Sequence, residues 1–131
     1  MTALILEPGK KGYVEDIQGS LKDLQERVGG LIEAVFLSPS DPVAIFVNEE
    51  GALLGLSPNR SLRDANNNVY CVLRGTAVLL GIDGSEVCGL SESLANKYLR
   101  RYGEPEQFHT DESLALDRWN YHWGRFPPIE L

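Results

Sequence analysis

The sequence has few cysteines and no long apolar run, and both absences restrict the class of protein. Two cysteines, Cys71 and Cys88, are too few for a disulfide framework; each lies in or beside an apolar run, so we expect small buried hydrophobic side chains in a reducing compartment. No run approaches the roughly 18 apolar residues of a membrane span. The N-terminus lacks the basic region and cleavage site of a secretory signal. We therefore expect a cytoplasmic protein with no membrane partner.

Concentrated positive charge is also absent. The chain carries 12 basic and 19 acidic residues, for a net charge of −7. Acids outnumber bases by 10 to 6 in residues 1–65 and by 9 to 6 in residues 66–131. This balance argues against non-specific binding of nucleic acid. The acids form no dense run, so an acidic mimic of nucleic acid, or an acidic structural protein, is only an alternative.

Signatures of catalysis and of metal binding are missing as well. His109 and His122 are thirteen residues apart, with no cysteine or histidine at a spacing typical of zinc sites. No nucleophile elbow, Walker or dinucleotide-binding glycine motif occurs. We expect no cofactor and no catalytic residue. The enzymatic alternative is a small hydrolase or transferase that uses Glu33 or Glu49 for acid–base chemistry.

The apolar patterns that are present predict an α+β fold. A chain of 131 residues suits one domain with a real core. We expect a small, mainly antiparallel sheet with one helix packed on a face in residues 1–90, and a helical and aromatic extension in residues 91–131 packed on the same domain. The strands are predicted, in order, at Ala3–Leu6, Leu31–Leu37, Val43–Val47, Ala52–Leu56, Val69–Leu73 and Thr76–Ile82.

Three helices are predicted. Tyr13–Gly29 has one apolar stripe, with Ser20 as a possible N-cap and Gly29 at the end. Ser91–Tyr102 is amphipathic and is followed by Gly103, and Asp111–Trp119 has a second helical pattern. Between the predicted strands, Arg74-Gly75 is either a hairpin turn or a bulge in one long strand, and Asp83-Gly84 is a strong turn signal.

Polar residues cluster at the ends of two apolar runs in Val43–Arg60. Asn48 and Glu49 follow the first run at a predicted hairpin turn, and Asn59 and Arg60 follow the second. Asn, Glu and Arg could together bind a nucleobase edge and a phosphate, with Glu33 and Thr76 completing the site. The same groups could instead form an internal network, with Asn48 bonded to its own turn and Arg60 paired with Glu33 or Glu49. Both interpretations remain open.

The C-terminal tail is rich in aromatic side chains. These are Trp119, Tyr121, Trp123 and Phe126. They suit an interface with a partner or a second copy of the chain, so a homo-oligomer is one alternative. Packing back over the sheet to complete the core is another, and stacking on a ligand is a third.

Four short marks give the chain a resemblance to a known family. They are Val28-Gly29-Gly30 with Glu33, Asn48-Glu49-x-Gly51, Asn59-Arg60, and Gly75-Thr76. Over about residues 3–89 the chain resembles the domain of unknown function three-eight-four-six, a family of small uncharacterised proteins from bacteriophages, conjugative elements and some bacteria. The resemblance implies a mobile-element setting, with the host cytoplasm as location if the protein is phage-encoded, but no reaction.

The resemblance and the polar clusters together suggest a non-enzymatic binder. We expect an accessory protein that counteracts host defence, by capturing a small nucleotide-like signal or by docking on a host protein. The enzyme and the acidic mimic described above are the alternatives.

Overall fold

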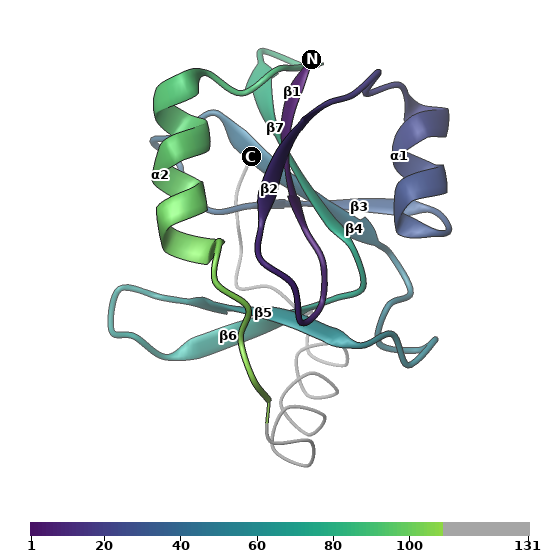
Figure 1. Cartoon of the computed structure of the whole chain (residues 1–131), viewed down its shortest axis with the longest axis vertical. Coiled ribbons are helices and arrows are strands. Elements are labelled where there is room, and N and C mark those ends of the chain that lie inside the picture. Colours follow the sequence, from purple (N-terminus) through teal and green to yellow (C-terminus); the bar gives the residue numbers. More distant parts are fainter. Residues whose placement is uncertain (109–131) are drawn as a thin grey trace.

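A computed structural model describes residues 1–108 of the chain (Figure 1). Eight strands and two helices lie in this part. In chain order they are β1 (Thr2–Leu6), β2 (Tyr13–Asp16), α1 (Leu21–Val28), β3 (Ile32–Phe36), β4 (Val43–Asn48), β5 (Pro58–Arg63), β6 (Val69–Arg74), β7 (Ala77–Asp83), β8 (Glu86–Cys88) and α2 (Glu92–Tyr102). The α+β class and the mainly antiparallel sheet are confirmed.

The strands form two sheets. The larger has six strands in the order β2-β1-β7-β4-β3, with β8 paired to β7. All its pairings are antiparallel, and β7 lies at its centre between β1 and β4. β5 and β6 form a separate antiparallel ribbon, which crosses beneath the larger sheet and α2 in Figure 1. We refer to β5 and β6 with their connecting loop as the ribbon.

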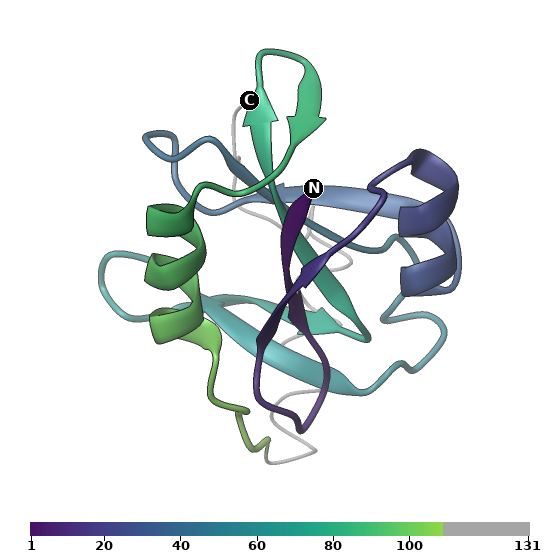
Figure 2. The same cartoon turned by 45° about the horizontal axis from the view of Figure 1, so that its top comes forward.

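Both faces of the larger sheet are covered, as Figures 1 and 2 show with α1 and α2 on opposite sides. Alternate residues of β1 and β4 point to opposite faces, so each strand contributes to two apolar clusters. One cluster, on the face of α1, includes Ile5 and Phe46. The other includes Leu4 and Ile45, and α2 and the ribbon close it. Coverage of both faces explains why all six residues of β4 are buried, as expected for the central Val43–Val47 run.

The prediction of one helix over Tyr13–Gly29 is wrong in its first half. Tyr13–Asp16 is the edge strand β2, which pairs with β1, and Gly19 has φ +75°, a conformation that no helix contains. The helix begins only after Ser20, whose side chain accepts from the Asp23 amide as predicted. It ends at Gly29, which adopts the left-handed conformation with φ +79°, also as predicted.

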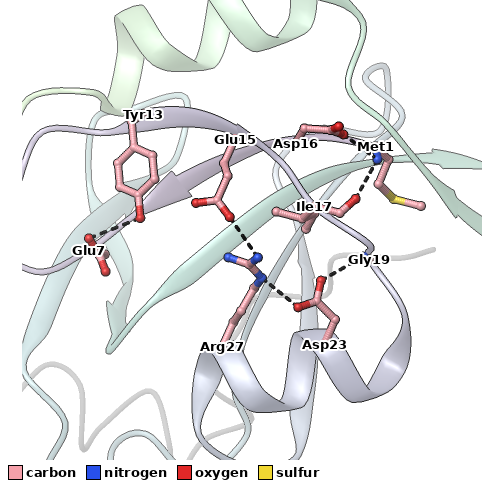
Figure 3. A network of polar contacts seen from close by, with 9 residues as sticks. All are labelled: Met1, Glu7, Tyr13, Glu15, Asp16, Ile17, Gly19, Asp23 and Arg27. Carbon is pink, nitrogen blue, oxygen red and sulfur yellow. Dashed lines mark hydrogen bonds and ion pairs between the residues drawn. The ribbon is translucent and has the colours of Figure 1, made fainter.

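A polar network fixes α1 against β2 (Figure 3). The Arg27 guanidinium lies 2.9 Å from the Glu15 carboxylate on β2 and 3.0 Å from Asp23 on its own helix. Asp23 also accepts from the Gly19 amide at 2.9 Å, and these contacts lower the pKa of its carboxyl, with the Gly19 bond as the largest favourable cause. These side chains therefore stabilise the turn between β2 and α1. In the continuous helix that was predicted, they would have lain on one face exposed to solvent.

The region around Asn48–Leu56 also differs from the prediction. Ala52–Leu56 is not a returning strand but a series of turns, and Asn48–Gly51 does not close a hairpin. The chain passes instead into β5, although no strand was predicted over Pro58–Arg63. Arg74-Gly75 is neither hairpin nor bulge: it is a corner at which the chain leaves the ribbon for the central strand β7, with Gly75 at φ +72°.

The last elements follow the prediction more closely. β7 and β8 form a hairpin with Asp83 opposite Glu86, and the intervening Gly84 has φ +63°. α2 begins after Ser91, whose side chain caps the Leu94 amide, and Gly103 follows its last residue. The predicted helix Asp111–Trp119 lies outside the described residues.

Candidate functional site

Asn48 and Glu49 lie where β4 ends, near the C-terminal end of α1. Asn48 is buried; its amide donates to the Val28 carbonyl at 3.1 Å, and its side-chain oxygen accepts from the Glu50 amide at 2.8 Å. Asn48 thus stabilises its own turn, as the structural interpretation expects. Glu49 is exposed, and its backbone amide donates to the Leu31 carbonyl.

Asn59 and Arg60 lie on β5 and contact different elements from those that Asn48 contacts. The Asn59 amide donates to the carbonyls of Leu6 and Gly75 at 2.8 and 2.7 Å, and its side-chain oxygen accepts from Arg60 at 2.7 Å. Both side chains are buried, with exposed fractions of 0% and 1%. The two predicted polar clusters therefore do not converge on one another.

Arg60 is surrounded by backbone carbonyls. Besides its bond to the Asn59 side chain, it donates to five of them, at distances from 2.7 to 3.3 Å: Glu7, Lys10, Asn59, Tyr102 and Gly103. These carbonyls come from the β1–β2 connection, from β5 and from the end of α2. Arg60 therefore joins three segments, and it does so through carbonyls rather than through the Glu33 or Glu49 carboxylates expected as its partners.

The charge of Arg60 is only partly compensated. Burial lowers the pKa of its guanidinium below the ordinary value, while the Glu106 and Glu104 carboxylates act in the opposite direction. The last carbonyls of a helix carry partial negative charge, which favours a cation at the C-terminal end of α2.

The other predicted site residues are dispersed. Glu33 is half-buried on the edge strand β3, and Thr76 is half-buried immediately before β7. Trp119, Tyr121, Trp123 and Phe126 lie outside the described residues. Ligand binding by Asn48, Glu49, Asn59, Arg60, Glu33 and Thr76, and an interface role for the four aromatic residues, stay predictions.

A concavity of about 360 Å³ lies between the ribbon and the end of α2, and we call it the hollow. Its lining includes Ser61, Arg63, Asp64 and Asn67 from the ribbon, and Arg101, Tyr102 and Glu106 from α2 and the segment after it. Ser61 directly follows the buried Arg60 along β5. The hollow therefore begins one residue after Asn59 and Arg60, which the sequence predicted as site residues.

The two acids of the hollow are bonded to the protein itself. The Glu106 carboxylate accepts from the Ser61 amide at 2.9 Å and from the Ser61 hydroxyl at 2.5 Å. Asp64 accepts from the backbone amides of Asn66 and Asn68, each at 2.9 Å, and so shapes the loop at the tip of the ribbon. Each acid thus already accepts two hydrogen bonds.

The two arginines of the hollow retain most of their donors. Arg63 donates from one terminal nitrogen to the Asn67 carbonyl at 2.9 Å. Arg101 lies 5.2 Å from the centre of the Tyr102 ring, and makes no hydrogen bond or ion pair with any other residue of the range 1–108. A guanidinium has five N–H groups in a planar fork suited to carboxylate and phosphate. The two arginines therefore offer unused donors to an anion, beside the carboxylates of Asp64 and Glu106.

Metal chemistry has no support from the described part of the chain. No group of three or more His, Cys, Asp or Glu side chains there could hold a metal ion. The same residues include no helix long and apolar enough to cross a membrane.

Sequence reasoning did not identify the hollow for two reasons. Arg63 and Asn67 lie outside every predicted strand and helix, whereas the ribbon places them beside the end of α2. Arg101 and Tyr102 were predicted to lie in an amphipathic helix, and they do lie in α2. A contact between residues about forty positions apart leaves no periodic signal in the sequence.

Comparisons with known proteins identify a family. The model of a domain of unknown function (DUF3846) matches residues 1–103. The match extends past residue 89, where the resemblance in the sequence ended, and includes α2 with Arg101 and Tyr102. No curated protein and no solved structure matches the chain. The chain belongs to the DUF3846 family of uncharacterised domains.

Proposed function

We propose that this domain is a non-enzymatic binder that captures a small nucleotide-like ligand in the hollow. The observation that carries the proposal is the pair Arg63 and Arg101, which line one concavity and retain most of their N–H donors. Ser61, Asn67 and Tyr102 add hydrogen-bonding and aromatic groups around them. Such a mixture binds a ligand with an anionic group and a polar, planar part.

The size of the hollow favours a small ligand. Its volume of about 360 Å³ lies near the lower end of the range for ligand sites, roughly 300–1,000 Å³. A mononucleotide suits this volume better than a dinucleotide. A docked protein would instead bury about 800 Å² on each partner, a much broader area than this concavity offers.

The biological setting in the proposal comes from the family resemblance. An accessory protein of a phage or mobile element would counteract host defence by sequestering a nucleotide-like signal. Sequestration needs binding without turnover, and the donors of Arg63 and Arg101 in the hollow serve binding.

The test is a titration of the ¹⁵N-labelled full-length chain with AMP, CMP, GMP and UMP, followed by amide chemical shifts. We expect the largest changes at the hollow, around Arg63, Asn67, Arg101 and Tyr102. Spectra that do not change with any of the four nucleotides, or changes concentrated elsewhere, would refute the proposal.

A matched pair of variants makes this test specific. Arg101→Ala should weaken the binding of the best nucleotide by about tenfold or more, because a charge-assisted hydrogen bond is lost. Arg100→Ala removes the same charge from the neighbouring exposed position of α2, which does not line the hollow. It should change the affinity by less than about twofold.

A further inference from the structure

The contact between Glu106 and Ser61 resembles the binding of a small anion. The carboxylate accepts from one backbone N–H and one hydroxyl, at 2.9 and 2.5 Å. Ser61 is itself buried, with 8% of its surface exposed. A buried amide and hydroxyl that both point at one carboxylate form an anion-binding position on the floor of the hollow.

Cationic groups surround this position. Arg63 and Arg101 line the same hollow, and the buried Arg60 precedes Ser61 on β5 and interacts electrostatically with Glu106. Within residues 1–108, Glu106 makes no ion pair with Arg63 or Arg101, and both of its hydrogen bonds are to Ser61. Asp64 lines the hollow too, and Glu104 also interacts electrostatically with Arg60, so three arginines and three carboxylates balance while Glu106 occupies the position. The surroundings become net cationic when Glu106 leaves it.

Glu106 comes from a segment outside the regular elements of the fold. It lies beyond α2, in residues 103–108, which form neither helix nor strand. It also follows the residues 1–103 that match the family, whereas Ser61, Arg63 and Arg101 lie within them. The groups of the anion position therefore lie within the residues that match the family, and the carboxylate that occupies it lies just outside them.

We infer that the hollow takes a phosphate monoester whose phosphate replaces the Glu106 carboxylate on Ser61, so that Glu106 acts as an internal competitor of the ligand. This inference rests on the proposed function, and it adds the ligand class and a regulatory contact. A phosphate has three terminal oxygens, enough to accept from the Ser61 amide and hydroxyl and from both arginines at once. A carboxylate has two, and those of Glu106 are already used by Ser61.

The experiment compares Glu106→Gln with the wild type, using AMP and adenosine as probes and isothermal titration calorimetry on the full chain. Removing the competing charge should tighten AMP binding by about tenfold, as expected for a charged hydrogen-bonding group. Adenosine, which has no phosphate, should bind more weakly than AMP and gain less than about twofold. Glu104→Gln is the matched control, since it removes the same charge two residues away from an exposed side chain that does not line the hollow.

The outcomes separate the inference from the proposed function. If Glu106→Gln binds AMP no more tightly than the wild type, Glu106 is not a competitor of the ligand. The same conclusion follows if Glu104→Gln gains as much AMP affinity as Glu106→Gln. Equal binding of AMP and adenosine in the hollow overturns the phosphate class but leaves the proposed binder intact. Thermal unfolding of each variant shows whether the fold is retained. Glu106→Ala repeats the test without the side-chain amide that Glu106→Gln leaves near Ser61. If neither variant nor wild type binds AMP, the inference is wrong.

Discussion

Arg60 offers the most direct test of how this fold is held together. Its side chain is 1% exposed and donates to five backbone carbonyls and to the Asn59 side chain. Arg60→Ala removes all of these donors and leaves a cavity lined by carbonyl groups. Water entering that cavity would satisfy part of them, which limits the loss.

The expected loss follows from the energetics of buried polar groups. A buried acceptor left without its partner costs about 1–3 kcal/mol, and removing one member of a buried charged set costs about 3–5 kcal/mol. Because the carbonyls share one donor group, their contributions are not additive, and we expect Arg60→Ala to lose about 3–5 kcal/mol. That is a large fraction of the roughly 5–15 kcal/mol that stabilises a typical domain.

The assay is urea denaturation followed by far-ultraviolet circular dichroism. Arg60→Lys keeps the charge but has three donors on one nitrogen, so it cannot reach all the carbonyls, and we expect a loss of about 2–3 kcal/mol. Arg63→Ala is the control on the same strand: its side chain is exposed with a single hydrogen bond to Asn67, so its loss should stay below about 1 kcal/mol. A loss below about 1 kcal/mol in Arg60→Ala would refute the reasoning, because the carbonyls would then need no buried donor.

Two further predictions concern stability. Hydrogen bonds from Lys97 and from Tyr98 lower the pKa of the Asp41 carboxyl below its ordinary 3.8, so its stabilising effect is present above that pH and is lost as the pH falls through the lowered value. Asp41→Asn should therefore flatten the acid side of a plot of unfolding free energy against pH, and an unchanged slope would contradict this. Gly81→Ala should cost about 1–3 kcal/mol in urea denaturation, because its new Cβ would lie 2.8 Å from a backbone carbonyl oxygen, that of Gly89; a loss under about 0.5 kcal/mol would contradict it.

The parts of the fold that sequence reasoning predicted correctly have local causes. The caps of α1 and α2 depend on a serine three residues before an amide and on a glycine after the helix. The all-apolar Val43–Val47 run depends on burial of both faces. These signals lie within a few residues of one another, so they can be read without knowing the tertiary structure.

The parts that failed depend on distant pairing. Tyr13–Asp16 becomes a strand because β1 provides its hydrogen-bonding partner, although its side chains extend the helical stripe of the next segment. The corner at Gly75 arises because β6 and β7 pair with different strands. Tertiary pairing of this kind overrides local propensity, and a single sequence does not contain the register.

The candidate site shows the same division within one strand. Side chains of a strand alternate between its two faces, so Arg60 and Leu62 are buried at 1% and 0% exposure while Ser61 and Arg63 line the hollow. Asn59 is buried as well because the register with β6 shifts between Pro58 and Arg60. Asn59 and Arg60, two of the residues that the sequence nominated as one site, thus form an internal lock, whereas the hollow begins one residue later at Ser61, which was not nominated. The lock joins β5 to the end of α2, the two elements that carry Arg63 and Arg101.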